Sequence, residues 1–236
     1  MRFPYGIELT ENCLDCRLRA GRFFCDLPQA TLERLQTLGV STVCPKGSIL
    51  FTQGQSPQKV FIVCLGHVKL SMASPTARRF CCGIAEPGMV LGLSSLISGK
   101  THEVDAEALE ACHLKVLKAS PLLGLLREDG AACLAAVRCL SNDVQRIIGC
   151  VRLLGLSHSG IQRLAKLLIQ LSAREGTKTR TVVYLSHREL AQMLGMTRET
   201  VTRLLALLTE QKIIQRNGPY VLVGNENALR MLSSSS

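Results

Sequence analysis

The chain has 236 residues, 47% of them apolar, so it can bury a sizeable core in one large domain or two modest ones. Its formal net charge is +10, which favours a polyanionic partner, with nucleic acid ahead of an anionic membrane surface. The sequence contains no apolar run long enough to predict a transmembrane helix, and its first residues lack the continuous apolar segment of a signal peptide. We therefore expect a cytoplasmic protein, in which most of the 11 cysteines are thiols, metal ligands or redox groups rather than structural disulfides.

The first feature along the chain is a cysteine-containing segment, residues 1–25. The stretch ENCLDCRLRAGRFFC, residues 11–25, places Cys13, Cys16 and Cys25 close together in sequence. A C-x-x-C pair lets two thiolates face one metal ion, but a single pair does not identify the metal. The segment is therefore open to interpretation as a metal site, a redox switch or three ordinary buried thiols.

Short apolar and β-branched runs separated by glycines fill residues 26–120. Examples are KVFIVCLGHVKLSM at residues 59–72 and RFCCGIAEPGMVLGL at residues 79–93. Short strands with regular turn signals are typical of a β-sandwich or a β-barrel. The sequence therefore predicts a β domain over this range.

From residue 121 the pattern becomes helical. Apolar residues recur at alternating intervals of three and four, as in the a/d seam of a coiled coil. The seam consists of Val137, Leu140, Val144, Ile147, Val151 and Leu154. It favours a two-stranded contact with a second copy, and a helix packed on its own domain is the alternative. We predict a dimerisation helix over residues 121–155, which the stretch GLSHSG then interrupts.

The last segment, residues 156–236, carries 11 Lys and Arg against 5 Asp and Glu, so basic charge is concentrated there. Within it, Ser186 and Glu189 form an S-x-x-E capping box, which begins a helix. Gly195 can end that helix with a positive φ angle, and Thr197 is a good N-cap for a second helix. This spacing predicts a helix-turn-helix.

The second helix of this pair presents polar side chains near its N-terminal end, the part that reaches base edges in the major groove. Arginine can bind guanine O6 and N7 with two hydrogen bonds, and glutamate can accept one from cytosine N4. Asn217-Gly218 then predicts a β-hairpin, a wing whose tip brings Arg216 to a phosphate. We predict DNA contacts from Arg198, Glu199, Thr202, Arg203, Ser186 and Arg216. A solvated helix face with an Arg–Glu surface pair is the alternative.

This order of elements, together with TRETVTRLL at residues 197–205, closely resembles the Crp/Fnr family of bacterial transcription regulators. The resemblance covers about residues 12–225 and implies an α+β fold: an N-terminal β-roll (double-stranded jelly roll) as sensor, a long dimerisation helix and a C-terminal winged helix-turn-helix. It also implies a homodimer, a palindromic operator in double-stranded DNA, and RNA polymerase as a further partner. The pattern RETVTR is especially similar to the cAMP-receptor branch, which implies that Arg198, Glu199 and Arg203 read bases.

The sensor of the cAMP-receptor branch holds the cyclic phosphate with a Gly-Glu-Leu stretch and, about ten residues later, an Arg-Ser pair. The matching stretches here are GLSSL at residues 92–96 and KTHEV at residues 100–104. They place His102 and Glu103 where arginine and serine would be. A cyclic phosphate needs a cation and backbone donors, and an acidic residue opposes it, so we do not expect cAMP to be the ligand.

The Fnr branch holds a [4Fe–4S] cluster with an N-terminal cysteine group and one distant cysteine. Similarity to it implies Cys13, Cys16 and Cys25 as ligands and Cys112 as the fourth. The third cysteine here follows after eight residues rather than five, and Cys112 precedes the family position by two or three residues. In a strand, an offset of two keeps a side chain on the same face, whereas an offset of three turns it away.

Other sensor chemistries stay open. Zinc can occupy the same four thiols, and a thiol–disulfide sensor can use Cys13 with Cys16 or Cys81 with Cys82. The cysteines can also be small hydrophobes, with another ligand or none in the roll. A heme would need a ligand such as His67, His102 or His113. No G-x-S-x-G, P-loop or H-E-x-x-H pattern occurs, so we do not expect an enzyme.

Overall fold

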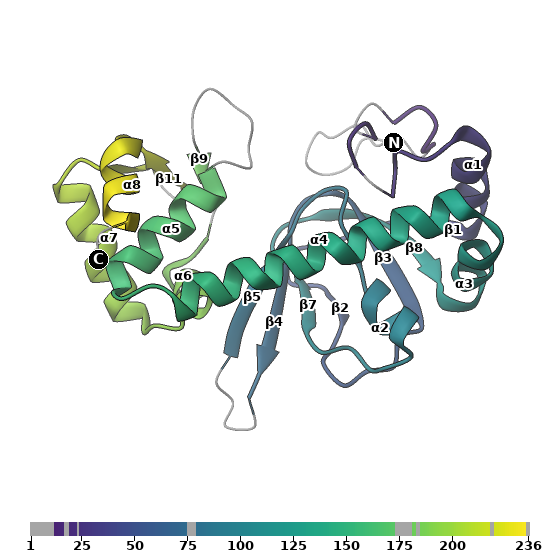
Figure 1. Cartoon of the computed structure of the whole chain (residues 1–236), viewed down its shortest axis with the longest axis horizontal. Coiled ribbons are helices and arrows are strands. Elements are labelled where there is room, and N and C mark those ends of the chain that lie inside the picture. Colours follow the sequence, from purple (N-terminus) through teal and green to yellow (C-terminus); the bar gives the residue numbers. More distant parts are fainter. Residues whose placement is uncertain are drawn as a thin grey trace. The chain divides into compact units, whose positions relative to one another are not determined.

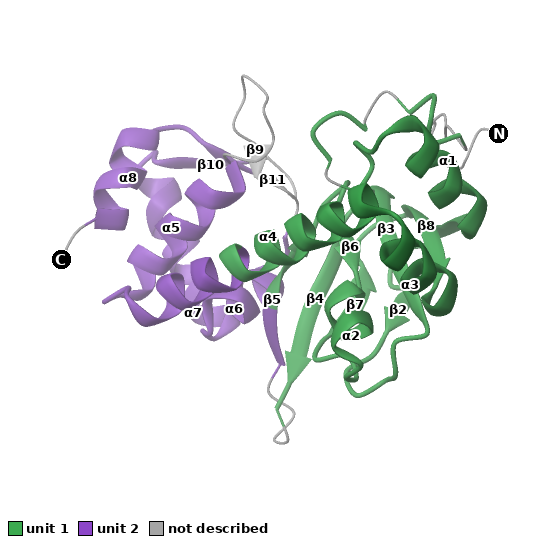
Figure 2. Ribbon diagram, turned by 45° about the vertical axis from the view of Figure 1, so that its right-hand side comes forward, with its two compact units in different colours: residues 1–78, 82–145 green, residues 79–81, 146–236 purple. Residues whose placement is uncertain are grey.

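A computed structural model describes the chain over residues 12–16, 19–22, 24–74, 79–172, 181–182, 185–217 and 220–234. The chain divides into two compact units, residues 1–78 with 82–145 and residues 79–81 with 146–236 (Figures 1 and 2). The first unit is rich in strands, and the second consists mainly of helices. The α+β fold class predicted from the sequence is confirmed. Among the described residues, no helix is long and apolar enough to cross a membrane.

Two four-stranded sheets form the β-roll, with strand orders β1-β8-β3-β6 and β2-β7-β4-β5. Neighbouring strands such as β1 with β8 and β4 with β7 pair in the antiparallel sense. The strands are β1 (Gly39–Cys44), β2 (Ile49–Phe51), β3 (Lys59–Leu65), β4 (Val68–Ala73), β5 (Arg79–Ala85), β6 (Val90–Leu91), β7 (Asp105–Ala108) and β8 (Cys112–Lys118).

Two helices lie within the range that the sequence predicted as strands, and this corrects the prediction for residues 26–120. They are α1 (Gln29–Leu38) and α2 (Leu93–Ser98). Both are short, and α1 buries only one narrow face, so their apolar periodicity is weak. Packing against the sheet stabilises them, since isolated helices of this length are marginal in water.

The predicted helix over residues 121–155 is two helices, α3 (Ala119–Glu128) and α4 (Gly130–Gly155). The break falls at Asp129, whose backbone is extended (φ −123°, ψ 107°). Asp129 Oδ1 accepts hydrogen bonds of 3.0 Å from the N–H groups of Ala131 and Ala132. It therefore caps α4, as aspartate does at many helix N-termini.

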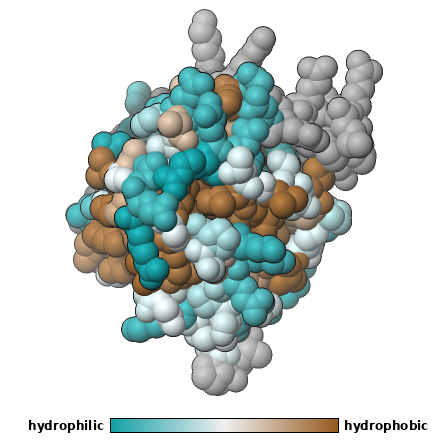
Figure 3. All heavy atoms as spheres, turned by 90° about the vertical axis from the view of Figure 1, so that its right-hand side faces the viewer, coloured by the Kyte–Doolittle hydropathy of each residue, from teal (hydrophilic) through white to brown (hydrophobic). Residues whose placement is uncertain are grey.

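Side chains alternate between two cores across the sheet that contains β3 and β8. Phe61 of β3 faces the core between the two sheets, together with Cys112 and Leu114 of β8. Val60 and Ile62 of β3 face the other side, where α1, α3 and α4 cover the sheet. At the end of this unit that carries α1 and α3, apolar side chains reach the surface in a band between polar groups (Figure 3). The two-residue alternation decides which cysteines share a face.

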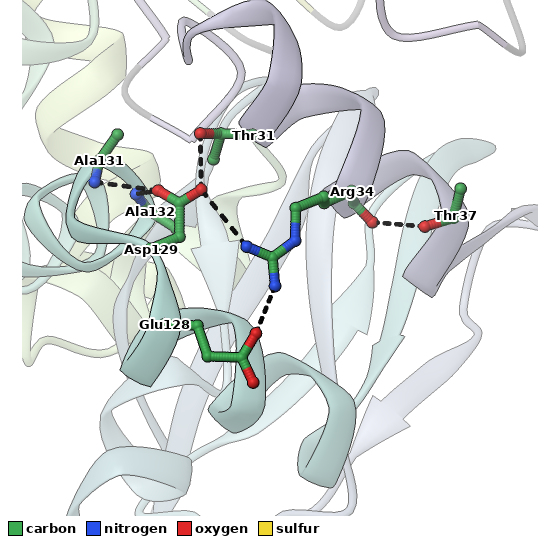
Figure 4. A network of polar contacts seen from close by, with 7 residues as sticks. All are labelled: Thr31, Arg34, Thr37, Glu128, Asp129, Ala131 and Ala132. Atoms are coloured by element: carbon green, nitrogen blue, oxygen red, sulfur yellow. Dashed lines mark hydrogen bonds and ion pairs between the residues drawn. The ribbon is translucent and has the colours of Figure 1, made fainter.

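Asp129 also connects α1 to the start of α4 (Figure 4). Its Oδ2 accepts a hydrogen bond of 2.8 Å from Thr31 Oγ1, and Arg34 forms ion pairs with both Glu128 and Asp129. The hydrogen bonds from the backbone of Ala132 and from Thr31 hold the pKa of Asp129 below its ordinary value. The network therefore joins the helix that follows the N-terminal cysteines to the predicted dimer helix.

The second unit has a helical core and a three-stranded sheet of order β10-β11-β9. Strands β10 and β11 pair from Ile214–Val223 to Asn217–Tyr220, so the predicted hairpin is confirmed, while Gly218 and Pro219 lie outside the described residues. The sequence did not predict β9 or α8. The elements are α5 (Gly160–Ser172), β9 (Thr181–Val182), α6 (His187–Leu194), α7 (Arg198–Glu210), β10 (Ile214–Asn217), β11 (Tyr220–Val223) and α8 (Glu226–Ser234).

Candidate DNA interface and cysteine site

The turn between α6 and α7 is built by the residues that the sequence predicted. Ser186 Oγ accepts a hydrogen bond from Glu189 N at 3.2 Å, and Glu189 Oε2 accepts one from Ser186 N at 2.7 Å. Gly195 ends α6 with φ +63°, and Thr197 Oγ1 accepts a hydrogen bond from Thr200 N at 3.2 Å. The capping box, the glycine stop and the second N-cap are all confirmed.

Burial of one face of α7 fixes which face remains outside. Val201, Leu205 and Leu208 are fully buried, as are Leu190 and Leu194 of α6, the helix that contacts α7. The resulting two-helix unit holds α7 by its apolar stripe. Its polar face is left for solvent or for a ligand.

The exposed face of α7 carries the predicted base-reading side chains. Arg198, Glu199, Thr202 and Arg203 are all exposed, and Arg216 is exposed on β10 of the wing. Thr202 Oγ1 donates a hydrogen bond of 2.9 Å to Arg198 O, within the helix. Ser186, also a predicted DNA contact, is partly buried at the N-cap of α6, where its hydroxyl belongs to the capping box.

One residue of this surface was missed from the sequence. His187 is the first residue of α6, and its Nδ1 lies 2.8 Å from Thr202 Oγ1. Burial and then the charges of Arg216 and Arg198 hold the pKa of His187 below its ordinary value. The imidazole therefore lies within the positively charged surface. Nothing in the sequence pattern pairs His187 with Thr202, because the contact joins two different helices.

Helix α4 presents a row of apolar side chains that the described residues of the chain do not cover. Four of the six predicted seam residues are more than half exposed, and Leu140 and Leu154 are partly buried. Single exposed apolar side chains are normal, but a row at heptad spacing is typical of a helix partner. The exposed seam residues are Val137 (55%), Val144 (54%), Ile147 (63%) and Val151 (63%).

The N-terminal C-x-x-C pair lies on a short turn. Cys16 N donates a hydrogen bond of 3.4 Å to Cys13 O, and Asn12 Oδ1 accepts one of 3.1 Å from Leu14 N. Cys13 N also donates to Gln36 Oε1 of α1 at 2.9 Å. The turn is thus attached to α1 and places both cysteines at its ends.

The structure does not bring Cys112 to the N-terminal cysteines, which corrects the expected fourth ligand. Cys112 is fully buried in the core between the sheets, where its thiol donates to His67 O at 3.3 Å and Glu110 O at 3.4 Å. Cys13 and Cys25 pack against the helix-covered core instead. The cause is the alternation of side chains along the strand, because the face on which Cys112 lies is turned away from the helices.

Cys64, rather than Cys112, is the β-roll cysteine that interacts electrostatically with the N-terminal thiols. It lies at an irregularity of the β3–β8 pairing, between Val63 and Leu65, and such bulges re-aim side chains. Burial raises the pKa of Cys64 to about 11, assisted by the neighbouring Cys13 and Cys16. No sequence pattern distinguishes Cys64, because its strand resembles an ordinary core strand.

Cys25 belongs to the same group. Burial, together with the proximity of Cys64 and Cys13, raises its pKa to about 12, while the charge of Arg22 opposes the shift. The electrostatic environment of Cys25 and of Cys64 thus includes the N-terminal pair, and we call Cys13, Cys16, Cys25 and Cys64 the sulfur cluster. Over the described ranges, no three His, Cys, Asp or Glu side chains are already arranged as a metal site.

A buried cation borders the sulfur cluster. Lys115 of β8 is 3% exposed, and its Nζ lies 3.5 Å from Cys13 Sγ. Its positive charge lowers the pKa of Cys64 against the larger effect of burial. The resemblance to the Fnr branch places its strand ligand two or three residues after Cys112. Lys115 occupies the second of these two positions.

A buried imidazole lies where the resemblance to the cAMP-receptor branch implies an arginine. His102 is 3% exposed, and its ring stacks on Phe51 with a centroid separation of 3.9 Å. Its Nδ1 lies 3.2 Å from Ser95 Oγ, and a Cβ added at Gly92 would lie 3.2 Å from its Cε1. Burial holds the pKa of His102 below its ordinary value, so the ring offers a phosphate no charge at neutral pH.

Two known domain families match the chain, one in its N-terminal part and one in its C-terminal part. The cyclic nucleotide-binding domain matches residues 42–129, and the Crp-like helix-turn-helix domain matches residues 162–232. The chain is 29% identical to the nitrogen fixation regulation protein FixK of Azorhizobium caulinodans over 203 residues, 84% of this chain and 80% of FixK. It is also 29% identical to the cyclic AMP receptor protein of Thermus thermophilus over 190 residues, 78% of this chain and 83% of the receptor.

The fold is shared with a solved structure. The structure of FixK2 from Bradyrhizobium japonicum superposes with a TM-score of 0.75 at 23% identity. The superposition covers 84% of this chain and 98% of the FixK2 chain. Since the identity is low, this similarity establishes the architecture alone.

Proposed function

We propose that this chain, a DNA-binding transcription regulator of the Crp/Fnr family, responds to redox state or oxygen through its sulfur cluster. Cys13, Cys16 and Cys25 would hold a [4Fe–4S] cluster, and we assign Cys64, in place of Cys112, as the fourth ligand. The observation that carries the proposal is the buried ammonium group of Lys115 beside Cys13 Sγ.

A buried ammonium group is costly unless a negative charge compensates it. Within the described part of the chain, Lys115 forms no ion pair with a carboxylate. Its polar neighbours are thiols, which become negative only when they lose their protons, as metal ligands do. A centre held by four thiolates would therefore provide the charge that Lys115 requires.

The donor set fits an iron–sulfur cluster. Four cysteine thiolates are the usual ligands of a [4Fe–4S] centre, which supplies redox chemistry when it is bound. The chain contributes four thiols on two rigid supports, the sheet at Cys64 and the turn attached to α1 at Cys13. The pKa of Cys25 and Cys64 is raised to about 12 and about 11, so loading would release protons and would strengthen as pH rises.

The response would reach DNA through a dimer. The apolar row on α4 fits a second copy of the same helix, because heptad spacing brings identical residues together in a two-stranded contact. Two copies of α7 would then read the two half-sites of a palindromic operator about one helical turn apart. We place this protein in the cytoplasm, with RNA polymerase as its further partner.

A chain of direct contacts leads from the sulfur cluster to α4. Cys13 N donates to Gln36 of α1, and Thr31 of the same helix donates to Asp129, the cap of α4. Closure of the N-terminal segment around a metal would shift Cys13 and hence bias α1. The packing of α4 in the dimer is the two-state element that this bias would change.

The first experiment is anaerobic purification, followed by an absorbance spectrum and iron, sulfide and zinc analysis. We expect a brown protein with iron and sulfide, bleached by air together with its affinity for DNA. Zinc in place of iron and sulfide would make the sulfur cluster a zinc site, and a metal-free protein would make it a thiol redox site. Either result would overturn the iron–sulfur proposal.

Two matched variants test the choice of the fourth ligand. Cys64→Ser should lower iron content strongly, since three thiolates leave a cluster with an open position, whereas Cys112→Ser should keep it. Both remove one thiol from a β-roll strand, so a general loss of stability would affect both. Iron loss in Cys112→Ser with full loading of Cys64→Ser would return the fourth ligand to Cys112.

A further inference from the structure

We propose that His187 is a phosphate-binding residue of the DNA interface and that it makes this contact as a protonated imidazolium. The histidine is the first residue of α6, beside the helix that carries the base-reading residues. The proposal concerns the DNA-binding unit alone, so it does not depend on the chemistry of the sulfur cluster.

The hydrogen bonds around His187 assign its tautomer. Thr202 Oγ1 donates its hydrogen to Arg198 O at 2.9 Å, so it accepts from His187 Nδ1–H at 2.8 Å. The other ring nitrogen, Nε2, is then left for a ligand, since His187 is only partly buried. Nε2 can bind a phosphate oxygen strongly only when it carries a proton, since a neutral ring of this tautomer offers a lone pair there.

The charges that face His187 are those of a phosphate-binding surface. The charges of Arg198 on α7 and Arg216 on β10 both disfavour a proton on the ring. Its own helix adds the exposed Arg188 and also Glu189, whose carboxylate is held by Ser186 N in the capping box. A phosphate placed among these groups would offset the arginine charges and favour the proton.

The direction of the pH effect follows from these charges. In the free protein the pKa of His187 is lowered below the ordinary value of 6.5 by burial, then by Arg216 and Arg198. In the complex the phosphate raises it, so the complex binds more protons than the free protein. DNA affinity should therefore rise as pH falls through the interval between the two pKa values, and this gain should be absent at higher pH.

The test uses a duplex selected from random-sequence DNA by the purified full-length protein. Dissociation constants are measured at constant ionic strength from about pH 5.5 to about pH 8, a window in which histidine titrates. The wild type should gain affinity toward low pH, by at most about tenfold per pH unit for one linked proton. His187→Gln can still donate to Thr202 but cannot be protonated, so it should lose this gain and match the wild type near pH 8.

His158→Gln is the matched control, because His158 is an exposed histidine in the same unit. It should keep the pH dependence of the wild type. His187→Arg, with a permanent charge, should bind tightly and independently of pH. An unchanged pH dependence in His187→Gln, or an equal loss of affinity at every pH, would overturn the proposal, the second because it indicates a structural role.

Discussion

Thr31 Oγ1 donates a hydrogen bond of 2.8 Å to Asp129 Oδ2 across 98 residues of sequence. The same carboxylate caps α4 through the N–H groups of Ala131 and Ala132. One side chain thus fixes the start of the long helix and holds α1 against it. Since α1 also binds the cysteine turn through Gln36, this contact is where a change in the sulfur cluster would reach α4.

Substitution Asp129→Ala should destabilise the protein by about 1–2 kcal/mol, because a helix N-cap and a partly buried hydrogen bond are both lost. Urea unfolding of Asp129→Ala, Thr31→Val and the double variant forms a cycle, and we expect a coupling of about 0.5–1.5 kcal/mol. Strict additivity of the two single effects would contradict a direct link.

The contribution of Asp129 should depend on pH in a defined direction. Its pKa is lowered in the folded protein, mainly by the Ala132 backbone and Thr31, so its stabilisation is present above the ordinary aspartate value of about 3.9. The stabilisation should fade as pH falls through the lowered pKa. The difference in unfolding free energy between wild type and Asp129→Ala should therefore shrink below about pH 4.

If the chain forms the dimer proposed above, substitution Ile147→Glu should break it, because it places a charge in the apolar row of α4, which would lie opposite its own copy. Operator affinity should fall with it, since the two half-sites are then bound independently. Sedimentation equilibrium gives the oligomeric state. The control variant Gln145→Glu introduces the same charge on the same helix at an exposed position outside the seam, so it should stay dimeric. An Ile147→Glu protein that remains dimeric and binds its operator normally would remove α4 from the interface.

Two arginines should differ in what they read. Arg203→Ala, on the exposed face of α7, should cost about 1–3 kcal/mol on the selected operator and relax base preference there. Arg216→Ala, on the wing, should weaken binding to the operator and to a random duplex alike. It should also reduce the slope of the logarithm of the binding constant against the logarithm of the salt concentration by about 1. Titrations on both duplexes at several salt concentrations separate the two roles. An equal loss on random DNA for Arg203→Ala would make Arg203 a phosphate contact.

Alkylation should distinguish the cysteines in reduced, metal-free protein. Burial raises the pKa of Cys25 to about 12, of Cys64 to about 11 and of Cys112 to about 12, and only a thiolate reacts with iodoacetamide. These three should therefore react slowly near neutral pH and faster as pH rises. Exposed Cys133 provides the internal reference in mass spectrometry of the digested protein. Rapid labelling of Cys64 at neutral pH would show that its site is open to solvent.

Local chemistry in the sequence determined most of the DNA-binding unit. Ser186 with Glu189, Gly195 and Thr197 fixed where two helices begin and end, because caps act within one turn of chain. The same locality explains the prediction of the hairpin at Asn217. The sequence does not predict a role for His187, because its partner, Thr202, lies on another helix. Only the packing of α6 on α7 brings the two residues together.

The sequence by itself therefore determined the fold class, the heptad seam and the polar face of α7, since each is a periodic or local property of the chain. Only the tertiary structure decided which cysteines meet. Because side chains alternate along β8, Cys112 lies in the core between the sheets. The irregularity in β3 and the packing of the N-terminal turn on α1 bring Cys64, Cys13 and Lys115 together. Such contacts depend on strand pairing and helix docking over long sequence separations, which no local pattern records.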